Sequence, residues 1–223
     1  MARQVAERIV ELSHSHRSSP VCVALSGGST PKRLYEVLAA PPYFDRADWR
    51  HLEFFFSDER SVPPDHPDSN YGMAAKWLLS KIPSPAHRML AEEGDAEGYE
   101  QLVRSRVPGR TDAVPAFDLI LLGMGNDGHT ASLFPGTRAL EECERLVVMN
   151  DVPQLRTKRM TFTYPLLNAA KRIWVLIAGA DKREIVARCS EARARGEKTY
   201  PVVGVEPVDG ELVWWLDEAA AGK

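Results

Sequence analysis

The segment FDLILLG at residues 117–123 constrains the fold of this chain more than any other part of the sequence. Its apolar run from Leu119 to Leu122 is uninterrupted, so a strand formed here must be covered on both faces. Such runs are typical of parallel sheets that lie between two layers of helices. The segment continues directly into the glycine-rich loop GMGNDGH, which ends in His129. We therefore expect a buried strand that delivers this histidine to the edge of a sheet.

Segments with strand character alternate with segments of helical periodicity along the rest of the chain. The expected strands cover residues 21–25, 51–57, 117–123, 145–150, 159–164, 172–179 and 211–217. The expected helices are an amphipathic opening helix with Val5, Ile9 and Leu12 on one face, then residues 32–40, 70–82, 96–107 and 181–194. This alternation predicts an α/β fold with a doubly wound, mostly parallel sheet and helices on both faces. A chain of 223 residues is long enough for one such domain, and we expect it to span residues 1–223.

Composition excludes several classes of function. The net charge of −3 provides no broad basic surface, so we expect neither nucleic acid nor an anionic membrane as a partner. The apolar runs are far shorter than the roughly 20 residues of a membrane helix, and the charged N-terminus does not resemble a signal peptide. We expect a cytoplasmic protein. Cys22, Cys143 and Cys189 form no C-x-x-C pair, and neither they nor the histidines have metal-ligand spacing, so we expect no bound metal.

The loop SGGSTP at residues 26–31 follows the first expected strand and precedes a helix. Glycines permit a tight turn, and Pro31 suits the first position of a helix. The backbone N–H groups of Gly28, Ser29 and Thr30 would then converge at the positive end of the helix, where an anion can bind. The alternative is an ordinary N-cap by Ser29 or Thr30. The loop is not a Walker A motif, which favours a single phosphate over a nucleoside triphosphate.

The spacing Gly123-x-Gly125-x-x-Gly128 also matches a dinucleotide-binding fingerprint. A dinucleotide site requires a long helix that begins inside the motif. Pro135 and Gly136 limit any helix here to about two turns, because proline is incompatible with a helix interior. We therefore expect no dinucleotide at this loop. The loop instead presents His129, whose side chain suits proton transfer near neutral pH, with Asp127 available to orient it. A structural histidine that caps the turn is the alternative.

The segment SDERSVPPDHPDSNYG begins at residue 57 and reads as a polar loop after the phenylalanine-rich second strand. Arg60 offers a planar guanidinium that can bind phosphate or carboxylate, and Asp58 lies close to it in sequence. The alternative is a surface ion pair, although such a triplet seldom follows a fully buried strand. In a doubly wound sheet, loops at the carboxyl ends of strands form the binding site. We expect the loops that carry Gly28, Arg60 and His129 to line one pocket.

Five segments together resemble the 6-phosphogluconolactonase family, and the resemblance extends over essentially the whole chain. They are LSGGSTPKRLYEVL, FFSDERSVPPDHPDSNYGMA, FDLILLGMGNDGHTASLFPG, RMTFTYPLLNAAKRIWVLIAGADKREIV and GELVWWLDEAAA, the last resembling a C-terminal strand and helix. The resemblance implies a Rossmann-like sheet, shared with glucosamine-6-phosphate deaminase. It also implies hydrolysis of 6-phosphoglucono-δ-lactone to 6-phosphogluconate in the oxidative pentose phosphate pathway without a cofactor.

The resemblance further implies that Arg159 and Lys182 bind the sugar phosphate; without it, each could equally be a solvated charge. Our hypothesis is that Gly28, Ser29, Thr30, Arg159 and Lys182 hold the phosphate of a small-molecule sugar lactone. His129 would take a proton from the attacking water, and Asp127 or Asp58 would orient the water or the imidazole. Arg60 would contact either the phosphate or the oxyanion. We expect a monomer.

Two alternatives remain. The deaminase has a glutamate at the position of Phe134 and a tyrosine at that of Arg60, and both departures favour the lactonase. A sugar-phosphate sensor domain would bind without turnover, but such proteins usually carry a DNA-binding domain. This chain has neither the extra length nor a basic patch.

Overall fold

The computed structural model describes residues 1–15, 19–109 and 114–223. Its central sheet has five strands in the order β2–β1–β4–β7–β8, and every neighbouring pair is parallel. The strands are β1 (Val21–Leu25), β2 (Leu52–Phe56), β4 (Leu119–Gly123), β7 (Arg172–Ile177) and β8 (Glu211–Leu216). The apolar run is the middle strand, β4, and Leu119 to Leu122 are fully buried. The sheet confirms the predicted α/β, doubly wound architecture.

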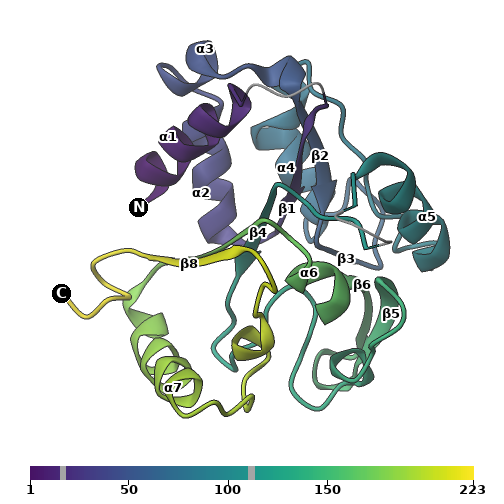
Figure 1. The fold of residues 1–223 in the computed structure, drawn as a ribbon, viewed down its shortest axis with the longest axis vertical. Coiled ribbons are helices and arrows are strands. Elements are labelled where there is room, and N and C mark those ends of the chain that lie inside the picture. Colours follow the sequence, from purple (N-terminus) through teal and green to yellow (C-terminus); the bar gives the residue numbers. More distant parts are fainter. Residues whose placement is uncertain (16–18, 110–113) are drawn as a thin grey trace.

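Helices cover both faces of this sheet. In Figure 1, α1 (Ala2–Ser13) and α2 (Ser29–Leu38) lie on one face, whereas α5 (Ala96–Arg106), α6 (Tyr164–Asn168) and α7 (Arg183–Ala194) lie on the other. The short helix α3 (Tyr43–Arg46) follows α2, and α4 (Asn70–Trp77) packs against α2. Val5 and Ile9 of α1 are buried, as the periodicity predicts. Among the described residues, no helix is both long and apolar enough to cross a membrane.

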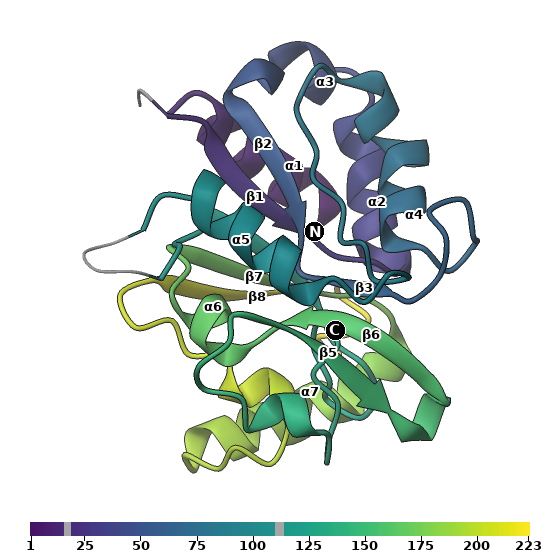
Figure 2. The same ribbon diagram turned by 90° about the vertical axis from the view of Figure 1, so that its right-hand side faces the viewer.

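A second, antiparallel sheet contains three strands that the sequence does not assign to it. It has the order β3–β6–β5, formed by β3 (Asp58–Arg60), β5 (Val147–Val152) and β6 (Thr157–Phe162). Figure 2 shows β5 and β6 beside β3, away from the parallel strands. Two expectations are therefore wrong. Asp58–Arg60 is a strand and not a loop, and the strands near 145–150 and 159–164 do not join the main sheet. An apolar pattern identifies a strand but not its pairing partner.

Three helix boundaries also differ from the prediction. α2 begins at Ser29 with Gly28 as its N-cap, so Pro31 occupies the third position and not the first. The helix expected at 70–82 ends at Trp77, because the backbone leaves helical geometry at Leu78 and continues as a short 3-10 turn. After β8 the chain forms turns and not the C-terminal helix that the resemblance implies. Asp217 accepts the backbone N–H of Ala220 and closes one of these turns.

The buried carboxylate of Glu59 connects β3 to α4. Glu59 accepts hydrogen bonds from the backbone N–H groups of Arg60, Asn70 and Tyr71 and from the hydroxyl of Ser69. Burial raises the pKa of Glu59, while these hydrogen bonds oppose that effect. Because both oxygens accept bonds from donors at the start of α4, this one side chain fixes the helix against the strand.

Replacement of Glu59 by glutamine should destabilise the protein. The amide NH₂ group would face donors where the carboxylate oxygen now accepts, which costs about 1–3 kcal/mol for the unsatisfied groups. Urea unfolding should measure this loss. The exposed Glu144→Gln provides the matched control and should leave stability within about 0.5 kcal/mol. Equal stability of Glu59→Gln and the wild type would contradict this account of α4.

Candidate active site

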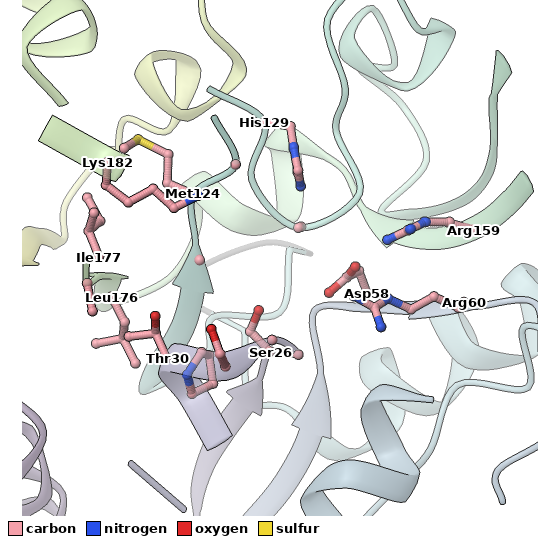
Figure 3. A pocket seen from close by; sticks show the side chains of 18 residues that line it. Ser26, Thr30, Asp58, Arg60, Met124, His129, Arg159, Leu176, Ile177 and Lys182 are labelled. Carbon is pink, nitrogen blue, oxygen red and sulfur yellow. The ribbon is translucent and has the colours of Figure 1, made fainter. Parts of the chain in front are cut away.

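A cleft opens at the carboxyl ends of β1, β2, β4 and β7. Its volume is about 690 Å³, including the part open to solvent. It is lined by Ser26, Gly27, Gly28, Ser29, Thr30, Pro31, Asp58, Arg60, Gly123, Met124, Gly125, His129, Ala131, Arg159, Leu176, Ile177, Ala178 and Lys182. The structure therefore brings the three segments singled out by the sequence into one cavity (Figure 3). Of the nine predicted site residues, all line it except Asp127, whose carboxylate contacts His129.

The first wall of the cleft is the turn between β1 and α2. Gly28 has a φ of 99°, a conformation that favours glycine, and it is the N-cap of α2 without a side-chain capping bond. The expected alternative, a cap by Ser29 or Thr30, is therefore not observed. Within the described residues, the backbone N–H groups of Gly28, Ser29 and Thr30 have no hydrogen-bond acceptor. Three unpaired donors at the positive end of a helix form a site for an anion.

The glycine loop after β4 is closed by its own hydrogen bonds. The N–H of Gly125 donates to the carbonyl of His129 at 2.9 Å, and the N–H of Gly128 donates to the carbonyl of Gly125 at 3.0 Å. The Thr130 hydroxyl donates to the carbonyl of Gly123. No helix begins between residues 124 and 137, all of which are described, so the loop lacks the helix that a dinucleotide site requires.

The loop brings Asp127 and His129 into direct contact. Nδ1 of His129 lies 2.6 Å from Oδ1 of Asp127, which also accepts the backbone N–H of His129. Burial disfavours the charged form of Asp127. The electrostatic attraction and hydrogen bonds of His129 outweigh burial, so the pKa of Asp127 is lowered. Since an ionised carboxylate only accepts, Nδ1 is the donor, and in the uncharged form of the ring Nε2 carries the free lone pair. Such an imidazole can remove a proton from a group in the cleft.

The second wall of the cleft includes β3, which carries Asp58. Asp58 is buried, and it accepts hydrogen bonds from the Ser132 hydroxyl at 2.7 Å and from the side-chain amide of Asn70 at 3.2 Å. Ser132 follows the glycine loop, and Asn70 begins α4, so Asp58 connects these two segments. The side-chain oxygen of Asn70 is buried, has no hydrogen-bond partner among the described residues and lies against Gly27, where a Cβ atom would be only 1.7 Å from it.

Two arginines, Arg60 and Arg159, lie next to each other beside Asp58 (Figure 3). Arg60 on β3 is the register partner of Arg159 on β6, so their side chains project from neighbouring backbone positions. Burial and the charge of Arg60 lower the pKa of Arg159. The Nε atoms of both side chains are buried and have no hydrogen-bond partner in the described part of the chain, although Nη1 of Arg60 donates to the carbonyl of Asp68. Adjacent like charges are unfavourable in a sheet, and an anionic ligand would relieve this repulsion.

Lys182 enters the cleft from the opposite side. Its ammonium donates to the side-chain oxygen of Asn126, at the tip of the glycine loop, at 2.6 Å. In Figure 3, Lys182 and Arg159 lie on opposite sides of His129. The cleft therefore has cationic groups at both ends and a potential base between them.

Sequence reasoning missed several residues of the site. Ser132 and Asn70 position Asp58, Asn126 holds Lys182, and the ring of Phe134 stacks on His129 with 4.0 Å between ring centroids. Three of these lie within ten residues of His129, which was a usable signal, whereas nothing in the sequence connects Asn70 to Asp58. In the described part of the chain, no three His, Cys, Asp or Glu side chains form a group that could hold a metal ion.

Comparison with known proteins extends over nearly the whole chain. Residues 1–214 match the family model of glucosamine-6-phosphate isomerases/6-phosphogluconolactonase. A 6-phosphogluconolactonase from Nostoc sp. is 41% identical over 208 residues, which is 90% of this chain and 83% of the relative. The crystal structure of the devB protein has a TM-score of 0.91 and 39% identity, covering 99% of this chain and 93% of that one. The 6-phosphogluconolactonase from Trypanosoma brucei has a TM-score of 0.82 and 32% identity, covering 99% and 92%.

Replacement of Gly125 by alanine should separate Asp127 from His129. A Cβ atom at position 125 would lie 2.1 Å from Nδ1 of His129 and 2.6 Å from Oδ1 of Asp127, so the pair could not keep its present contact. Gly123→Ala is the matched control in the same loop, because its Cβ would meet no atom within 4 Å. Crystal structures of the two variants should show the hydrogen bond broken only in Gly125→Ala. An intact 2.6 Å contact in that variant would refute the argument.

Proposed function

Because the chain belongs to the glucosamine-6-phosphate isomerase/6-phosphogluconolactonase family, we propose that residues 1–223 form one domain that hydrolyses 6-phosphoglucono-δ-lactone to 6-phosphogluconate. It would be a carboxylic ester hydrolase of the pentose phosphate pathway, active in the cytoplasm as a monomer. The observation that carries the proposal is the hydrogen-bonded Asp127–His129 pair, which lies between two cationic walls of one cleft.

The chemistry requires one base and donors for one oxyanion. A δ-lactone is an activated ester, so water can attack its carbonyl carbon once a proton is removed. Nε2 of His129 takes this proton as the oxygen–carbon bond forms, and the Asp127 carboxylate stabilises the resulting imidazolium. The ring carbon–oxygen bond then breaks, and the imidazolium returns the proton to the departing ring oxygen. The product is an open-chain acid with a new hydroxyl group.

The unpaired donors of the cleft divide between the two ends of the substrate. The N–H groups of Gly28, Ser29 and Thr30 would bind the 6-phosphate together with Lys182. We extend this phosphate site to Arg159, which enters the cleft from the other wall. Among the described residues, Arg159 forms no salt bridge, so its charge is available to an anion.

Arg60 is our candidate donor to the tetrahedral oxyanion. The N–H groups of Gly125, Gly128 and His129 already have acceptors within the glycine loop, which leaves few loop donors for the oxyanion. Arg60 lies next to the buried Asp58, whose carboxylate is the second candidate for orienting the water. Removal of one such oxyanion donor typically reduces turnover by about 10²–10³-fold.

The alternative reactions lack an observation in their favour. In a deaminase-type reaction, a glutamate would assist the histidine from the position of Phe134, and the phenyl ring there has no acid–base function. A sensor that binds sugar phosphate without turnover would not need a histidine oriented by a carboxylate.

Replacement of His129 by alanine should reduce kcat by about 10²–10⁴-fold with little change in KM, because the base acts mainly in the transition state. The assay is acid release from freshly generated 6-phosphoglucono-δ-lactone, corrected for spontaneous hydrolysis. His66→Ala, in the exposed segment between β3 and α4, is the matched control and should retain wild-type turnover. A His129→Ala enzyme as fast as the wild type would remove His129 from the mechanism.

Replacement of Lys182 or Arg159 by alanine should raise KM for the phosphorylated lactone by about tenfold or more, since each charged hydrogen bond is worth about 1.5–3 kcal/mol. KM for unphosphorylated glucono-δ-lactone, measured in the same assay, should change little. If either variant affects both substrates equally, that residue does not belong to the phosphate site.

A further inference from the structure

We propose that Phe134 is a positioning residue whose ring holds the imidazole of His129 and the guanidinium of Arg159 in a fixed mutual arrangement. The inference rests on the proposed function and deepens it. Phe134 is buried and does not line the cleft, so it acts on the substrate only through these two side chains.

The contact between Phe134 and His129 fixes the tilt of the imidazole ring, which the hydrogen bond to Asp127 does not restrict. The two rings stack with centroids 4.0 Å apart and planes 22° apart. Asp127 holds only Nδ1, and its side chain is 45% exposed, so this carboxylate alone would allow the imidazole to tilt. A flat, buried surface beneath the ring removes that tilt. It keeps Nε2 directed at the cleft, which Figure 3 shows as the direction of the His129 side chain.

Phe134 contacts the guanidinium of Arg159, for which the described residues provide no ion pair. The Cζ atom of Arg159 lies 5.4 Å from the centre of the Phe134 ring, within the range of a cation–π interaction. Arg159 also stands opposite Arg60, whose charge repels it. A carboxylate partner would stabilise Arg159 but would compete with an anionic substrate. The aromatic face stabilises the guanidinium while leaving its hydrogen-bond donors available.

The backbone that carries Phe134 is itself tightly held. Its carbonyl accepts hydrogen bonds from the N–H and the hydroxyl of Thr137. The Thr137 hydroxyl accepts in turn from the side-chain amide of Asn150 on β5, which also donates to the carbonyl of Ser132. The ring is therefore anchored to the antiparallel sheet that bears Arg159, and through Ser132 to Asp58. The anchored Phe134 ring therefore sets the position of the proposed base, His129, relative to Arg159, which would bind the substrate's phosphate.

The test compares two leucine substitutions of buried phenylalanines. Phe134→Leu removes the flat ring at the site, whereas Phe117→Leu makes the same change in the core, where Phe117 contacts Phe55 and Phe162. We expect Phe134→Leu to lower kcat by about tenfold or more and to raise KM for the phosphorylated lactone by at least about threefold, because both partners lose orientation. Phe117→Leu should change neither once activity is normalised to folded protein. Phe134→Tyr, which keeps the ring, should restore both constants toward wild type.

A structural measurement separates this inference from the proposed function. The His129 ring protons should give NMR signals displaced upfield by the Phe134 ring, assigned by comparison with His129→Asn. These signals should move downfield in Phe134→Leu but not in Phe117→Leu. If the wild type does not hydrolyse the lactone, the proposed function fails, while this shift still tests the stacking. Unmoved His129 signals, or unchanged kcat and KM in a folded Phe134→Leu, would overturn the inference.

Discussion

The parallel alignment of β1, β2, β4 and β7 is the constraint on which the rest of this structure depends. Parallel strands place all their carboxyl ends at one edge of a sheet, so the loops that follow them meet there although they are distant in sequence. The buried apolar strand β4 lies at the middle of this arrangement and carries the loop with Asp127 and His129. The sheet thus provides a rigid base for the loops that form much of the site.

The antiparallel sheet contributes Asp58, Arg60 and Arg159 to the cleft. Because the chain after β2 forms the strand β3, this sheet aligns Arg60 with Arg159 and places Asp58 in the same cleft. The hydrogen bond between Ser132 and Asp58 then connects this second sheet to the loop of His129. The cleft is in effect the junction of the two sheets, which explains why residues of both line it.

The electrostatics of the cleft favour an anionic ligand even though the chain as a whole carries a net charge of −3. Unpaired N–H groups, Lys182 and the adjacent arginines project into one cavity, and their acidic neighbours are engaged elsewhere. Asp58 accepts from Ser132 and Asn70, and Glu59 accepts from the start of α4. Local placement of charges, and not the overall balance, determines what such a cleft can bind.

Features that depend only on neighbouring residues could be predicted before the fold was known. The apolar run of β4, the glycine turn before α2 and the two-residue separation of Asp127 and His129 are local, so composition and spacing were sufficient to predict them. The pairing of β3 with β6, the contact of Ser132 with Asp58 across 74 residues and the contacts of Phe134 with His129 and Arg159 follow only from the folded arrangement of the chain. The physical reason is that strand pairing and side-chain packing depend on which distant segment competes best for each surface, and a local pattern carries no information about that competition.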